Sequence, residues 1–145
     1  MYKRIVVGTD GSPSALTAVR AAAELAKQNG AELHIVTAYR PMSSLMTHPE
    51  FAMLSASALD NVDPAEGARE VTSRTAEAVS AGLEVQQHQI GSPAADALCD
   101  VASNIDADLI VVGSRGMTGA RRILGSVPNS VAHNANCSVL IVNTD

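Results

Sequence analysis

Short apolar runs alternate with longer segments of helical periodicity along the whole chain. Four runs rich in Val, Ile and Leu predict strands, and the first of them is typical of a strand buried in a parallel sheet. These runs are 4–8 ("RIVVG"), 32–39 ("ELHIVTAY"), 108–113 ("DLIVVG", the most apolar, expected in the sheet interior) and 137–143 ("CSVLIVN"). A fifth segment, 83–90 ("LEVQQHQI"), alternates apolar and polar residues, which predicts a half-exposed strand near a sheet edge.

Helix start and stop signals lie between the predicted strands. Ser12 and Pro13 have the residue types of an N-cap and a first helical residue, and Asn29-Gly30 is a stop signal. The Gly-Ser-Pro start recurs before the next apolar helical segment, so Ser92 is expected to cap a helix there. The repeated signal predicts two helices that begin in the same way.

Two further helices and one irregular segment complete the pattern. A polar, Ala-rich helix is predicted over 64–81, and a short helix is predicted from a cap at Ser126 to about His133. Between the second strand and the predicted helix over 64–81, residues 40–60 show no regular period of apolar positions. So long an irregular stretch is often functional. Its Met and Phe side chains either shield a ligand or partner, or cover the sheet edge or a dimer contact.

Five strands that alternate with four helices predict an open, doubly wound α/β sheet, because parallel strands need helical crossovers and these are right-handed. With two helices on each face, the expected strand order is 3-2-1-4-5, in a single domain over residues 1–145. This order puts the topological switch between the first and fourth strands, where such sheets bind ligands at the strands' carboxyl ends. The segments expected there are 8–12 ("GTDGS") and 113–119 ("GSRGMTG").

Composition limits the function classes. The formal net charge of −5 argues against general binding to nucleic acid or to anionic membranes. No apolar run approaches the roughly 20 residues that span a bilayer, and the first residues enter a strand without a signal-peptide pattern. Cys99 and Cys137 stand alone in apolar contexts, which predicts small buried thiols in a reducing cytoplasm.

One glycine-rich segment of this acidic chain, residues 113–127, is rich in arginine. Its glycines leave backbone N–H groups uncovered, and a helix that begins at Ser126 presents free N–H groups and a positive dipole end, both of which favour a phosphate. Arginines add charge-assisted hydrogen bonds. The alternative is a set of ordinary turns with solvated cations (Arg115, Arg121, Arg122) and a serine that only caps its helix. The candidate binding residues of this segment are Gly113, Arg115, Gly116, Gly125, Ser126 and Val127.

The ends of three other predicted elements add candidates. After the first strand, Thr9 and Asp10 either meet ribose hydroxyls or Mg²⁺ beside phosphates, or brace and cap the first helix. A single carboxylate is a weak metal site, so Mg²⁺ is expected only together with a nucleotide. Ala38 and Val112, at the ends of the second and fourth strands, either line an apolar slot for a base or belong to the core.

Catalytic patterns are missing from the sequence. The phosphate-loop pattern GxxxxGK[ST] is absent, no nucleophile elbow occurs, and His34, His48, His88 and His133 are scattered without metal-ligand spacing. With no candidate general base or water-positioning group, hydrolysis of a bound nucleotide is expected to be slow or absent. A slow ATPase is the most that an enzymatic interpretation supports.

The chain resembles the universal stress protein family. The resemblance runs from 5–22 ("IVVGTDGSPSALTAVRAA") to 107–142 ("ADLIVVGSRGMTGARRILGSVPNSVAHNANCSVLIV"). Nucleotide-binding members of the family carry Gly, two residues, Gly, nine residues, then Gly-Ser or Gly-Thr. Gly113, Gly116 and Gly125-Ser126 match these positions, but the spacer "MTGARRIL" holds only eight residues.

The resemblance implies the strand order 3-2-1-4-5, an ATP-type nucleotide in this crevice, and Asp10 near the ribose or metal. It also implies homodimers that pair the last strands, 137–143, edge to edge, and an apolar edge strand independently needs cover. Some relatives bind cyclic AMP and others bind no nucleotide. Because the spacer is one residue short, either the backbone at Gly119 compensates for the deletion, or the pocket is too narrow to hold a triphosphate. Two hypotheses follow: a nucleotide-binding stress or signalling module, and an interaction protein whose 40–60 segment meets a partner.

Overall fold

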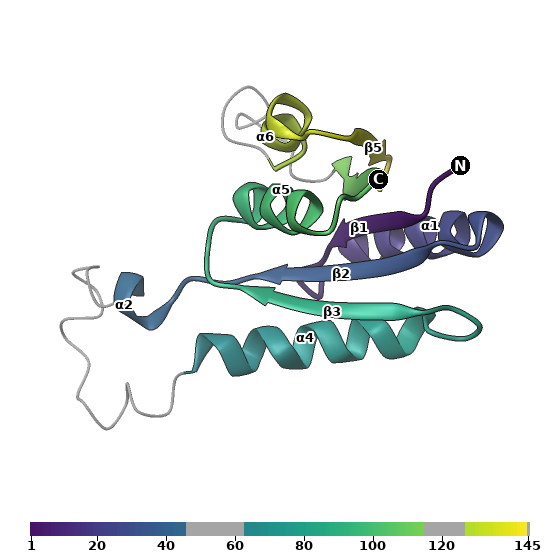
Figure 1. Ribbon diagram of the computed structural model, residues 1–145. Coiled ribbons are helices and arrows are strands. Elements are labelled where there is room, and N and C mark those ends of the chain that lie inside the picture. The colour runs from purple at the N-terminus through teal and green to yellow at the C-terminus, as the bar shows by residue number, and fades with distance from the viewer. Residues whose placement is uncertain (46–62, 115–126, 145) are drawn as a thin grey trace.

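The centre of the molecule is a parallel sheet of five strands, shown in Figure 1 as a computed structural model that describes residues 1–45, 63–114 and 127–144. The strands lie in the order β3-β2-β1-β4-β5, which confirms the predicted doubly wound topology. Each neighbouring pair is parallel. The bounds are β1 Arg4–Gly8, β2 Glu32–Ala38, β3 Val85–Ile90, β4 Leu109–Gly113 and β5 Ser138–Val142.

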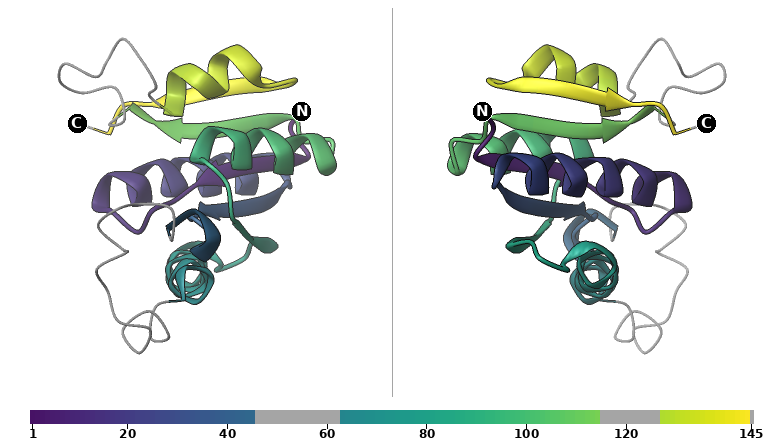
Figure 2. Two further views of the ribbon diagram at one scale, coloured as in Figure 1. Left: turned by 90° about the vertical axis from the view of Figure 1, so that its left-hand side faces the viewer. Right: turned by 90° about the vertical axis from the view of Figure 1, so that its right-hand side faces the viewer.

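Two of the longer helices cover each face of the sheet. On one face α1 and α4 share an aliphatic cluster with the strands, and on the other face α5 and α6 do so. Figure 2 shows β5 beside β4 at one end of the sheet and α4 at the opposite end. The helices are α1 Pro13–Asn29, α4 Pro64–Val79, α5 Ala94–Asn104 and α6 Val127–Asn134, with a short helix, α2 Met42–Leu45, after β2. Residues 46–62, most of the predicted irregular segment, lie outside the described residues.

The middle strands fill the core with aliphatic side chains that alternate between the faces. In β1, Ile5 and Val7 join the cluster of α1 and α4, whereas Val6 joins the cluster of α5 and α6. All three side chains are fully buried. Because both faces of these strands are covered, their sequences are continuously apolar, which explains why the short runs predict them well.

The predicted cap of α1 is confirmed, and that of α5 is wrong. Ser12 Oγ accepts a hydrogen bond from the Ala15 amide, and Gly30 ends α1 in the left-handed conformation. In α5 the N-cap position is occupied by Pro93, whose ψ of 148° is extended, and no side chain caps the helix. The helix therefore begins one residue later than the repeated sequence predicts, and Ser92 lies too far upstream to reach its free amides.

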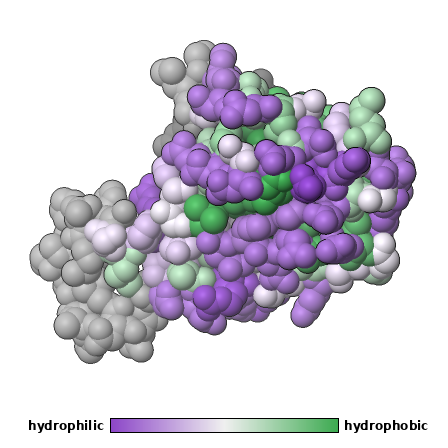
Figure 3. All heavy atoms as spheres, viewed as in Figure 1, coloured by the Kyte–Doolittle hydropathy of each residue, from purple (hydrophilic) through white to green (hydrophobic). Residues whose placement is uncertain are grey.

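The two edges of the sheet differ in character. β3 is half-exposed, as predicted, and Gln86 and Gln87 are exposed on it. β5 leaves two large apolar side chains partly exposed, Leu140 at 37% and Ile141 at 41%. On the face seen in Figure 3, hydrophobic surface follows β2 beneath α5 and is surrounded by hydrophilic side chains.

The expectation of buried thiols is wrong in degree. Cys99 and Cys137 are free and half-buried, because they pack at the margin of the cluster under α5 and α6. Partial burial raises the pKa of each thiol, which keeps both protonated at neutral pH. Within the described ranges, no helix combines the length and apolar character needed to cross a membrane.

Candidate functional site

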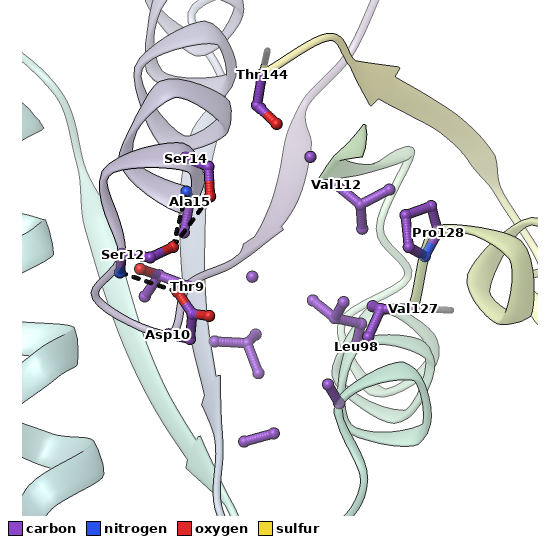
Figure 4. A pocket seen from close by; sticks show the side chains of 15 residues that line it. Thr9, Asp10, Ser12, Ser14, Ala15, Leu98, Val112, Val127, Pro128 and Thr144 are labelled. Carbon is purple, nitrogen blue, oxygen red and sulfur yellow. Dashed lines mark hydrogen bonds between the residues drawn. The ribbon is translucent and has the colours of Figure 1, made fainter. Parts of the chain in front are cut away.

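A pocket of about 330 Å³ opens at the carboxyl ends of β1 and β4, at the predicted topological switch point (Figure 4). Its volume lies near the lower end of the range of about 300–1,000 Å³ that is typical of small-molecule sites. Its walls come from β1, α1, β2, α5, β4, α6 and the residues after β5. The lining residues are Gly8, Thr9, Asp10, Ser12, Ser14, Ala15, Val36, Ala38, Ala94, Leu98, Val112, Gly113, Val127, Pro128 and Thr144.

The loop from β1 into α1 forms a polar wall. Asp10 Oδ1 accepts a hydrogen bond of 2.9 Å from the Ser12 amide, and Ser12 Oγ lies 3.2 Å from Ser14 Oγ. Figure 4 shows these side chains together on one side of the pocket. Asp10 is exposed, and among the described residues its second carboxylate oxygen accepts no hydrogen bond. A hydroxyl-bearing ligand can therefore donate to it without breaking the loop.

The opposite wall is apolar. Leu98 of α5, Val112 of β4 and Pro128 of α6 face the polar loop across the pocket in Figure 4. Val36 and Ala38 of β2 continue this surface. A slot with aliphatic walls on one side and a carboxylate on the other suits a ligand with a flat apolar part and a hydroxylated part.

The residues after β5 close a third side of the pocket. The Thr144 amide donates to Ser114 Oγ at 3.1 Å, which ties the end of β5 to the end of β4. A Cβ added to Gly113 would lie 3.0 Å from Thr144 Cγ2, so Thr144 lies close against the end of β4 and would have to shift slightly for a larger residue. Thr144 had no sequence signal because it follows the last predicted strand.

Six of the ten predicted site residues lie around this pocket: Thr9, Asp10, Ala38, Val112, Gly113 and Val127. The other four, Arg115, Gly116, Gly125 and Ser126, lie outside the described residues, as do Gly119, Arg121 and Arg122. Sequence reasoning missed several walls of the pocket, notably Ser14, Leu98 and Pro128. Ser14 stands in the first turn of a helix whose start was predicted and could have been inferred from it. Leu98 and Pro128 show only the ordinary pattern of buried helix faces.

Two of the scattered histidines form a pair away from the pocket. His34 Nδ1 lies 2.9 Å from His88 Nε2, and the rings stack with centroids 5.2 Å apart. The register of β2 and β3 pairs Val36 with His88, so the two histidines are diagonal neighbours on one face. Glu32 Oε2 lies 3.4 Å from His34 Nε2. No group of three metal-ligating side chains occurs in the described part of the chain.

Comparison with known proteins relates the chain to one family. It matches the model of the universal stress protein family over residues 1–143. The universal stress protein Rv1636 of Mycobacterium tuberculosis (strain H37Rv) is 37% identical over an alignment of 145 positions that covers 99% of this chain and 97% of the relative.

Solved structures give the same relation. A crystal structure of a universal stress protein in complex with cAMP has a TM-score of 0.77 and 31% identity, covering 99% of this chain and 98% of that one. The universal stress protein of Archaeoglobus fulgidus in complex with dAMP has a TM-score of 0.71 and 27% identity, with 98% of each chain covered.

Proposed function

This chain belongs to the universal stress protein family, and we propose that it binds an adenine nucleotide in the pocket at the ends of β1 and β4. One observation carries the proposal: an exposed carboxylate and an aliphatic slot face each other across one pocket at the switch point of the sheet. Two structural neighbours, solved with cAMP and with dAMP, support the ligand class.

The polar wall and the aliphatic wall contact different parts of the nucleotide. Asp10 accepts hydrogen bonds from the ribose hydroxyls, and the adenine lies against the aliphatic wall near Ala38 and Val112. The phosphates point to the segment between Gly113 and α6, because Val127, the first residue of α6, lines the pocket and the helix dipole there favours an anion. Arg115, Gly116, Gly125 and Ser126 are proposed phosphate contacts in that segment.

ATP is the nucleotide we propose first, with any Mg²⁺ carried on its phosphates. Cyclic AMP is the second candidate, because a neighbour is solved with it and the pocket volume of about 330 Å³ suits a compact ligand. ATP carries three phosphates and cyclic AMP carries one, and the short spacer between Gly116 and Gly125 determines how many phosphates the site accommodates. Titration with both nucleotides therefore shows whether the site with this spacer accepts a triphosphate.

In the cell we propose a cytoplasmic stress-response or signalling module in one domain, acting through nucleotide-dependent contacts without strong catalysis. A homodimer through β5 fits this role, because Leu140 and Ile141 are exposed on an edge strand. Unpaired apolar edges of this kind are prone to pair with another strand. The alternative is a protein that acts through protein contacts alone and binds no nucleotide.

Calorimetric titration with ATP, with and without Mg²⁺, and with cyclic AMP tests the proposal. Wild-type protein is expected to bind one of them with a micromolar dissociation constant, and Asp10→Ala to weaken binding at least about tenfold, since hydrogen bonds to charged groups contribute about 1.5–3 kcal/mol. Asp100→Ala is the matched control, because Asp100 is an exposed aspartate of α5 that does not line the pocket. If none of these nucleotides binds, and if the purified protein releases no adenine nucleotide on denaturation, the proposal is wrong. The protein would then act through protein contacts alone.

A further inference from the structure

The polar loop of the pocket rests on α4, a helix that contributes no lining residue to the pocket. Two side chains of α4 one turn apart lie against the loop: Val71 faces Gly11, and Thr75 contacts Thr9. We propose that Val71 and Thr75 are positioning residues that hold the loop so that Asp10 faces the ligand. The effect on ligand binding rests on the proposed function; the effect on the loop does not.

The Thr75 contact fixes the direction of the Thr9 hydroxyl. Thr75 Oγ1 donates to the Val71 carbonyl at 2.8 Å, which uses its only proton. Thr9 Oγ1, 3.4 Å from Thr75 Oγ1, is therefore the donor in that contact. With its proton directed at Thr75, the Thr9 oxygen accepts the Gly11 amide at 3.2 Å. Both threonines are buried, so water does not replace the missing partner if one hydroxyl is removed.

The Val71 contact holds the next turn of the loop. Gly11 has a φ of +83°, and a Cβ built on it would lie 3.3 Å from Val71 Cγ1. Its backbone thus lies close against the valine in a conformation that favours glycine. The next residue, Ser12, donates its amide to Asp10 Oδ1 at 2.9 Å. A shift of Gly11 away from α4 therefore moves the group that orients the carboxylate.

Another threonine pair on the same helix supplies a control. Thr72 Oγ1 lies 2.8 Å from Thr37 Oγ1, and both residues are buried. Neither residue lines the pocket. The pair joins α4 to β2 with the same chemistry as the Thr75–Thr9 contact but does not involve the loop. Comparing the two separates loop positioning from the general stability of α4.

The test compares Thr75→Val, Thr75→Ser and Thr72→Val by amide hydrogen exchange without ligand and by calorimetric titration with ATP and cyclic AMP. Thr75→Val is expected to accelerate Gly11 exchange and to weaken binding by up to about fivefold, the factor that one net hydrogen bond corresponds to. Thr75→Ser keeps the hydroxyl and is expected to restore both values. Thr72→Val is expected to leave both at their wild-type values. Val71→Ala, at a half-buried position, gives a second variant with the same expected direction.

Three results would overturn the proposal: unchanged Gly11 exchange in Thr75→Val, equal effects of Thr75→Val and Thr72→Val, or failure of Thr75→Ser to restore exchange. If wild-type protein binds neither nucleotide, the proposed function fails, but Gly11 exchange in the same variants still decides whether α4 positions the loop.

Discussion

Mild acid is expected to destabilise the fold through the histidine pair of β2 and β3. His34 is buried, and His88 Nε2 lies 2.9 Å from its Nδ1. Burial, and secondarily the charge of His34, lower the pKa of His88 from its usual value near 6.5. The folded state therefore binds fewer protons than the unfolded state in weak acid. The contribution of neutral His88 to the free energy of unfolding is therefore fully present above the unfolded pKa of about 6.5, and it is lost as the pH falls below that value.

The size of the effect follows from the geometry. Two unit charges at the 5.2 Å ring separation repel by about 3 kcal/mol at an effective dielectric constant of about 20, and burial opposes the charged form further, so His88 takes up a proton less readily in the folded protein than in the unfolded chain. A difference of one bound proton costs about 1.4 kcal/mol for each pH unit below the unfolded pKa of about 6.5, which sets the upper bound at about pH 5.5. His88 is half-exposed, and solvent screening reduces the expected loss to about 1 kcal/mol.

Urea unfolding at about pH 7.5 and 5.5 measures this loss directly. His88→Gln leaves a side chain that can still hydrogen-bond to His34 but does not titrate, so most of the loss of unfolding free energy is expected to disappear. His133→Gln removes an exposed histidine at the end of α6 and is expected to keep the wild-type pH dependence. If His88→Gln retains the full acid sensitivity, the histidine pair is not its source.

Three other changes have outcomes that the structure determines. Hydrogen bonds from two backbone amides lower the pKa of the Asp108 carboxyl below 3.8, so its contribution to stability is present above that pH and is lost below it. Asp108→Asn is therefore expected to reduce the loss of stability in acid, which thermal unfolding at several pH values would show. Gly11→Ala is expected to cost about 1–2 kcal/mol more than Gly30→Ala, because both positions have positive φ but only Gly11 packs against Val71; equal losses in denaturant unfolding would contradict this. Ile141→Lys is expected to give a monomer by light scattering if β5 forms the dimer edge, and a dimer that survives the charge would exclude that edge.

The sheet could be predicted because its local and tertiary signals agree. β1 and β4 are short aliphatic runs covered on both faces, and their sequences show it directly. Ser12 and Pro13 start α1 as their residue types predict. The same signal at Ser92 was misleading, because Pro93 adopts an extended ψ and moves the start of α5 by one residue. A cap therefore depends on a backbone angle that the residue types alone do not fix.

The site was predictable where chain order alone determines position. Thr9 and Asp10 follow a strand beside the switch point, so the topology brings them to the pocket. Leu98 and Thr144 reach it through the packing of α5 and the return of the chain after β5, which no local pattern encodes. The pairing of His34 with His88 likewise depends on the register of two strands, which the sequence leaves undetermined.

Mapping the amide chemical shifts of the labelled protein during titration with ATP or cyclic AMP shows whether a nucleotide binds in the pocket at the ends of β1 and β4. Saturable changes are expected in the β1–α1 loop from Gly8 to Ser14, at Ala38, around Val112 and Gly113, and at Val127. Amides at the opposite end of the sheet, such as those of Glu32 and Leu109, are expected to remain unchanged. Saturable changes confined to another surface, or no changes with either nucleotide, would contradict the assignment of this pocket.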